Sequence, residues 1–314
     1  MTRFRIRSRG PSRRDLLRAG VVGAAAALMP PAGGPAAAAG PFRLGAGRFE
    51  LLVISDGHLV LPTSFLAPDV KPEERAAVLA ESGETGEQYH SPTNVTLIRA
   101  GSDVILVDAG SGPNFMPSAG KLIENLDAAG IAADAVTRIV FTHGHPDHLW
   151  GAVDALDELA FPNAAYVVAA TEWDFWTGDA AVRGLPAERA GFVTGARRSF
   201  ARIKDKVTVV KPGDDIVTGL RMVDTPGHTQ GHVSLDVEGQ VLVTGDALTH
   251  PVISFRHPQW RPAADHEPDR AAATRTRLLD RLAGERMRLI GFHLPYPGMG
   301  HVEKKDGAYR FVPA

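Results

Sequence analysis

Apolar positions recur with two different periods along the chain between residues 49 and 292. Short apolar runs between turn residues predict strands over 49–54, 95–99, 103–108, 136–142, 165–169, 207–210, 222–224, 233–237, 241–244 and 288–292. Apolar residues spaced by three and four predict helices over 116–129, 147–159, most of 171–206, and 268–282. Strand-rich halves are interleaved with helices and no linker separates them. The pattern therefore predicts one domain with two sheets covered by helices, an α/β sandwich.

The first forty residues differ from the rest. Six arginines precede the first acidic residue, Asp15, and an alanine-rich apolar stretch over 16–29 leads into a Pro/Ala/Gly run. This is the layout of a secretory signal, and Ser-Arg-Arg-Asp-Leu-Leu at 12–17 resembles the twin-arginine motif of the Tat pathway. We expect residues 1–39 to be a Tat-type signal peptide that engages the Tat export machinery and is cleaved near Ala39. Residues 40–314 would then form the mature domain, which would be periplasmic or secreted.

Composition limits the partners and the metal ligands that this protein can have. The 34 basic and 36 acidic residues give a net charge of -2, which does not favour nucleic acid as a partner. The apolar stretch at 16–29 is too short and alanine-rich for stable membrane anchoring. With no cysteine among 314 residues, disulfides and thiolate metal sites are excluded. Any metal must be held by histidine and carboxylate.

One hexapeptide carries the candidate chemistry. His143-Gly144-His145-Pro146-Asp147-His148 follows a predicted strand, and such a turn can present one pair of ligands to each of two metals. Three further polar residues stand at predicted strand ends, where loops present functional groups: His228, Asp246 and His293.

These elements, in their order along the chain, resemble the metallo-β-lactamase fold superfamily. They are HxHxDH at 143–148, TPGHTxGH at 225–232, TGD at 244–246 and GxH at 291–293. The resemblance implies an αββα sandwich with two mixed sheets. It also implies that His143, His145 and His228 bind one metal, that Asp147, His148 and His293 bind another, and that Asp246 bridges them. The cofactors would be two divalent ions, zinc in the first place, with iron, manganese or cobalt as alternatives.

The implied reaction is hydrolysis by a hydroxide shared between the two metals, with Asp147 and Asp246 as the catalytic carboxylates. The runs at 254–260 and 292–301 resemble the branch that contains methyl parathion hydrolase and secreted lactonases and esterases. The expected substrate is therefore a small molecule with an ester-type bond: a lactone, an aryl ester or a phosphotriester.

Substrate contacts are expected from five residues near these motifs: Trp150, Phe255, Trp260, Tyr296 and His250. Core packing remains an equal alternative for each aromatic residue. Phe292 and Trp176 belong to the same group of candidates. His232 is expected to orient the loop of His228, and His266 receives no role.

Three other functions remain open. An iron-dependent oxygenase or sulfur dioxygenase would use the same ligands, and a thioesterase of the glyoxalase II type would need a basic surface. The third is a non-catalytic metal-binding protein, although a complete ligand set argues against it. A homodimer is compatible with the sequence.

Overall fold

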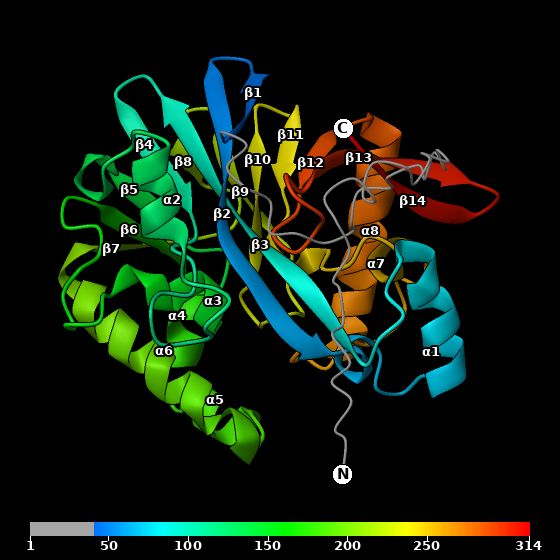
Figure 1. Ribbon diagram of the computed structural model, residues 1–314. Helices are drawn as coiled ribbons and strands as arrows, with labels where there is room; N and C mark the ends of the chain where they lie inside the picture. The colour runs from blue at the N-terminus through cyan, green and yellow to red at the C-terminus, as the bar shows by residue number, and fades with distance from the viewer. Residues whose placement is uncertain (1–40) are drawn as a thin grey trace, which may run out of the picture. The chain divides into compact units, whose positions relative to one another are not determined.

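The computed structural model describes residues 41–314 (Figure 1). The predicted signal peptide over residues 1–39 lies outside the described residues. Within them, no helix combines the length and the apolar character needed to cross a bilayer.

Side chains along strand β2 (Phe49–Pro62) divide between two cores. Leu52 and Ile54 belong to one core, whereas Leu51 and Val53 belong to another. Successive side chains of a strand point to opposite faces of its sheet. Both faces of this sheet are therefore covered.

The first sheet has the order β1-β2-β3-β4-β5-β6-β7. The pairs from β1 to β4 are antiparallel and those from β4 to β7 are parallel, so the sheet is mixed. Its other strands are β1 (Phe42–Ala46), β3 (Gln88–Ala100), β4 (Asp103–Val107), β5 (Arg138–Val140), β6 (Ala165–Ala169) and β7 (Val207–Val210).

The second sheet has the order β14-β13-β12-β11-β10-β9-β8. Only β11 and β12 pair in parallel, so this sheet is also mixed. Its strands are β8 (Asp215–Val217), β9 (Leu220–Asp224), β10 (Val233–Val237), β11 (Val241–Val243), β12 (Arg288–Ile290), β13 (Met299–Lys305) and β14 (Ala308–Pro313).

Helices form the two outer layers (Figure 1). The core outside the first sheet includes Leu126, Trp176 and Phe200, which come from three different helices. A second core fills the space between the sheets, and a third joins the second sheet to α8 through Leu279 and Leu282. The predicted αββα sandwich is confirmed. The helices are α1 (Pro72–Leu79), α2 (Leu122–Ala128), α3 (Pro146–Leu149), α4 (Ala170–Thr177), α5 (Ala180–Gly184), α6 (Ala190–Ile203), α7 (Ile253–Arg256) and α8 (Pro268–Glu285).

Two predicted helices are shorter than expected. The helix predicted over 116–129 begins only at Leu122, because the buried carboxylate of Asp56 accepts a hydrogen bond from the Leu122 backbone N–H and holds the preceding loop out of the helix. The helix predicted over 147–159 ends at Leu149 and continues as a 3-10 turn to Ala152. There the backbone N–H of Gly151 donates to the carbonyl of Gly110 instead of continuing the helix.

Some strands are longer than predicted, and several short elements were not predicted. Strands β2 and β3 are longer than predicted, and the helical content predicted over 171–206 is confirmed as α4, α5 and α6. The short elements β1, β8, α1 and α7 and the final hairpin of β13 and β14 were not predicted. This hairpin completes the edge of the second sheet.

Candidate metal centre

Seven histidine and aspartate side chains converge from four strand ends. Residues 143–148 follow β5, His228 lies between β9 and β10, Asp246 follows β11, and His293 follows β12. Because β11 and β12 run in parallel, their carboxyl ends deliver Asp246 and His293 to the same edge of the sheet. All seven are buried: His143, His145, Asp147, His148, His228, Asp246 and His293.

Local backbone geometry turns these side chains toward one another. Pro146 occupies the first turn of α3, where a fixed φ favours helix initiation, and His145 before it is extended. Gly144 has no room for a side chain, since a Cβ there would lie 2.5 Å from Nε1 of Trp176. The backbone at Gly144 therefore packs directly against the indole of Trp176.

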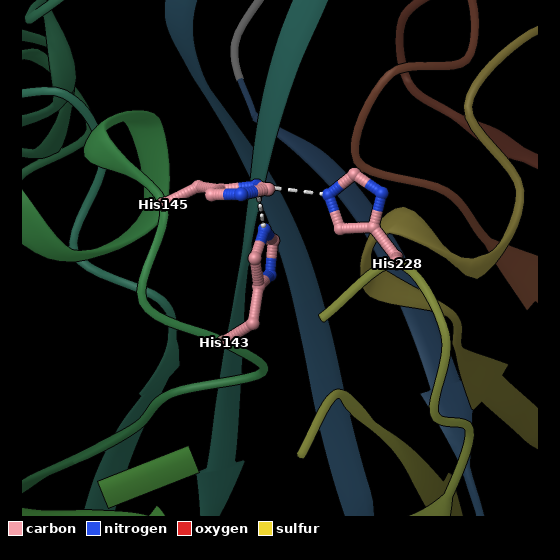
Figure 2. A group of neighbouring side chains, drawn as sticks. All are labelled: His143, His145 and His228. Carbon is pink, nitrogen blue, oxygen red and sulfur yellow. Dashed lines mark hydrogen bonds between the residues drawn. The ribbon is translucent and has the colours of Figure 1, made fainter. Parts of the chain in front are cut away.

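His143, His145 and His228 form the first group (Figure 2). Nδ1 of His145 lies 3.0 Å from Nε2 of His143 and 2.9 Å from Nε2 of His228. Oδ2 of Asp246 approaches Nε2 of His228 to 3.3 Å. Three ring nitrogens and a carboxylate oxygen thus face a common point.

Asp147, His148 and His293 form the second group. Oδ2 of Asp147 lies 3.2 Å from Nε2 of His293 and 3.5 Å from Nε2 of His148. Asp246 closes this group as well, with Oδ1 at 3.2 Å from His148 Nε2 and Oδ2 at 3.2 Å from His293 Nε2. Its carboxylate therefore stands between both groups.

Unpartnered atoms test whether this arrangement fits metal ions. Oδ2 of Asp147, Nε2 of His148 and Oδ1 of Asp246 are buried, and although they lie 3.2–3.5 Å from other polar atoms of the cluster, none of them makes a hydrogen bond of acceptable geometry. A buried polar atom without a partner costs about 1–3 kcal/mol, so three at one point need a common explanation. Divalent cations would satisfy all three, and the nitrogen and oxygen donors suit them. The residues fit two metal ions.

The opposite ring nitrogens are held by protein groups. Nδ1 of His148 lies 2.8 Å from Oδ2 of Asp108, which also accepts a hydrogen bond from Thr142 Oγ1. Nδ1 of His293 lies 2.8 Å from the carbonyl oxygen of Pro92, and it donates there. Such contacts fix the tautomer and the direction of a metal-binding imidazole.

Burial sets the charge of the first group. It lowers the pKa of His143 and of His145 well below the ordinary value, and neighbouring imidazoles lower both further. Both rings are neutral near pH 7 and keep lone pairs for a cation. For His148, burial also lowers the pKa, but the carboxylates of Asp246 and Asp147 outweigh it and raise that pKa.

His232 positions Asp246. Its Nε2 accepts a hydrogen bond of 2.9 Å from the Asp246 backbone N–H, and its Nδ1 donates to the Thr225 carbonyl at 3.0 Å. Burial lowers the pKa of His232 to about 3, so the ring stays neutral and this acceptor persists at neutral pH. The predicted role of His232 in orienting the loop of His228 agrees with its bond to Thr225, in the same turn.

Glu172 joins the two histidine loops and was not predicted. Its carboxylate accepts hydrogen bonds from the backbone N–H of Gly144 at 2.8 Å and of Gly231 at 3.1 Å. Trp176 Nε1 and Thr229 Oγ1 donate to the same carboxylate. No local pattern marks this residue, because its partners come from three separate segments.

A cavity of about 310 Å³ opens onto both groups. Its floor includes His145, Asp147, His228, Asp246 and His293. Its walls are mainly apolar and are made by Leu59, Leu61, Phe65, Leu66, Phe115, Phe192 and Pro262.

None of the five predicted substrate residues lines this cavity. Phe255 is fully buried against Phe311 in the core of the second sheet, and the hydroxyl of Tyr296 donates to the Val53 carbonyl. His250 is buried and contacts the carboxylate of Glu84.

Two of the five stand behind the cavity wall. Trp150 packs edge-on against Phe115 and Phe192, which line the cavity. Trp260 shares a core with Leu66, which lines it as well. Of the additional candidates, Phe292 contacts His148 with its ring tilted by 31°, and Trp176 is fully buried.

The chain belongs to the metallo-beta-lactamase superfamily, whose family model matches residues 89–302. The dizinc quorum-quenching lactonase AidC, in complex with a product, superposes with a TM-score of 0.81 at 26% identity over 88% of this chain and 97% of its own. AbOPH, a hydrolase in the beta lactamase superfamily, gives 0.80 at 29% identity over 88% and 98%. These neighbours agree with the predicted lactonase-like branch.

Curated relatives match over a shorter range. An uncharacterized protein of Mycobacterium leprae is 34% identical over 155 residues, which are 48% of this chain and 64% of that protein. The chain thus spans slightly less than two thirds of this relative.

Proposed function

We propose that this protein is a metal-dependent hydrolase that holds two zinc ions and cleaves an ester-type bond. The observation that carries the proposal is the position of Asp246, whose carboxylate lies within 3.3 Å of His228 and 3.2 Å of His293. A carboxylate shared by two groups of ligands is what a two-metal site requires. Nitrogen and oxygen donors without thiolate suit zinc in a hydrolytic site.

Bound at these positions, two divalent ions would supply an activated water near neutral pH and polarise the carbonyl or phosphoryl oxygen of a substrate. The protein orients the reactants. Asp147 lines the cavity next to His293, and its Oδ2 has no hydrogen-bond partner. Burial raises the pKa of Asp147, but His148 and His293 outweigh it and lower that pKa. An ionised Asp147 can therefore accept a proton during turnover.

The cavity favours an uncharged substrate. The only basic side chain on its wall besides the histidines is Arg189, which donates to the carbonyl oxygens of Ala263 and Ala264. This guanidinium is occupied by the backbone and is a poor partner for a substrate carboxylate. A lactone or aryl ester with an apolar group fits these walls better than a β-lactam or a glutathione thioester, both of which carry carboxylates. The likeness to AidC supports a lactone first.

A substrate panel tests the proposal. Zinc-loaded protein is assayed with a lactone, an aryl ester, a phosphotriester and a β-lactam. We expect turnover of the lactone or aryl ester, with no turnover by Asp246→Asn. The exposed Asp224→Asn, at the end of β9, is the matched control and should keep full activity. If protein that holds two ions turned over none of these substrates, the proposed hydrolase function would be refuted.

A further inference from the structure

His266 contacts a predicted metal ligand on the side that faces away from the metal. Nε2 of His266 lies 3.0 Å from Nε2 of His145. The other ring nitrogen of His145, Nδ1, faces His143 and His228. His145 therefore has one nitrogen for the ion and one for His266.

Gln230 gives this contact a direction. Nδ1 of His266 lies 3.1 Å from Oε1 of Gln230, an oxygen that only accepts. With the Gln230 amide in this orientation, His266 carries its proton on Nδ1 and accepts at Nε2. His145 donates from Nε2 and keeps a lone pair on Nδ1, which is the nitrogen that faces the metal group.

Asp265 does the same for a second ligand. Its Oδ1 lies 3.0 Å from Nδ1 of His228 and accepts that proton, which leaves the lone pair of His228 on Nε2. Asp265 is in turn held by Arg275, a buried guanidinium 3.3 Å from its Oδ2. The backbone N–H of His266 donates to the His228 carbonyl, so the segment is fixed to the ligand loop.

We propose that Asp265 and His266 are a positioning pair for the first metal position. Two adjacent residues set the tautomers of two of its three imidazole ligands. The pair should determine how tightly this position holds its ion, which deepens the two-metal function proposed above and rests on it. The second position depends on other groups, since Asp108 holds His148 and Pro92 holds His293.

Metal affinity separates the pair from a structural role. His266→Phe keeps a ring of similar size but offers no acceptor. His266→Gln supplies an amide oxygen, and Asp265→Asn removes the charge beside His228. His257→Phe is the control, because His257 is also half-buried and stacks on an aromatic ring, that of Trp260.

Zinc and cobalt titrations against a competing chelator give the affinity of each position in the full chain. We expect His266→Phe to weaken one position by about 10- to 100-fold, the usual effect of removing such a partner. The other position should keep its wild-type affinity. His266→Gln should recover part of the loss, Asp265→Asn should weaken the same position, and His257→Phe should bind as wild type does.

A second readout follows the proton itself. Ring ¹⁵N–¹H correlation spectra of the metal-free chain should place the His145 proton on Nε2 in the wild type and show a mixture of the Nδ1–H and Nε2–H tautomers in His266→Phe. Thermal unfolding checks that each variant folds. If His266→Phe does not fold, the metal affinity of Asp265→Asn is compared with that of the wild type instead. Unchanged affinities in His266→Phe and Asp265→Asn, with an unchanged His145 tautomer, would overturn the pair. Wild-type protein that binds two ions but hydrolyses no ester would refute the proposed function and leave the pair standing.

Discussion

Nδ1 of His145 and Nε2 of His228 lie 2.9 Å apart, although the two histidines are 83 positions apart in the chain. In the tautomers set by His266 and Asp265 neither nitrogen carries a proton, and Nε2 of His143 also lies 3.0 Å from the same Nδ1. Three nitrogens that converge on one point repel through their lone pairs unless a cation lies among them. A cation bound among these nitrogens would replace the repulsion between their lone pairs by attraction to the metal.

The first prediction is that metal stabilises the folded protein. Zinc should bind the folded chain and not the unfolded one, which stabilises by about 2.7 kcal/mol when free metal exceeds Kd by 100-fold. Calorimetry with and without zinc should show a higher Tm with the ion, and chelation should reverse it. An equal Tm in both states would contradict a cation site at His145 and His228.

Glu172→Gln should destabilise the protein. The carboxylate accepts from two backbone N–H groups, one indole and one hydroxyl, two donors to each oxygen, and an amide keeps an acceptor for only one of these two pairs. Leaving one buried donor unsatisfied costs about 1–3 kcal/mol. Urea denaturation measures the loss, with the exposed Glu188→Gln as control. Equal midpoints for the two variants would show that the carboxylate does not hold the histidine loops.

Phe192→Ala should weaken binding of substrates with large apolar groups. Phe192 lines the cavity and packs edge-on against His145, so truncation removes apolar surface from the substrate wall. Full burial of such a side chain is worth about 1.5–3 kcal/mol. A loss of that size should lower kcat/KM for a long-chain ester, relative to kcat/KM for a short-chain ester, by roughly tenfold or more. A constant ratio would place the substrate elsewhere.

Export is a separate prediction, which rests on residues 1–39. Replacing Arg13 and Arg14 by lysine should retain the protein in the cytoplasm, because the Tat pathway reads the paired arginines. Cell fractionation measures this, and sequencing of the exported chain should give an N-terminus near Gly40. Unchanged export of the lysine variant would exclude this route.

Sequence reasoning predicted the fold, and the seven residues that it proposed as metal ligands lie together in the structure. His143, His145, Asp147 and His148 fall within six positions, and strand ends supplied the others. Asp265, His266 and Glu172 escaped notice because each acts on residues that are near only in the folded chain. His266, for example, lies 121 positions from His145.

The substrate wall was harder to predict. The sequence around an aromatic residue looks the same whether the ring packs in a core or lines a cavity. Phe255, for example, is buried in a core. The actual wall includes Leu59 on the long strand β2, Phe65 on the 3-10 helix that follows it, and Phe115 on a loop whose course depends on tertiary contacts. Asp56, for instance, shapes the loop of Phe115 through hydrogen bonds to Ser111 and Gly120.

The count of metal ions per folded chain tests the central claim most directly. Elemental analysis of purified protein should give two divalent ions per chain, and Asp246→Ala should lower that count because both positions share this carboxylate. Asp224→Ala should retain both ions. One ion or none in the wild type, or two ions that persist in Asp246→Ala, would contradict a two-metal centre bridged by Asp246.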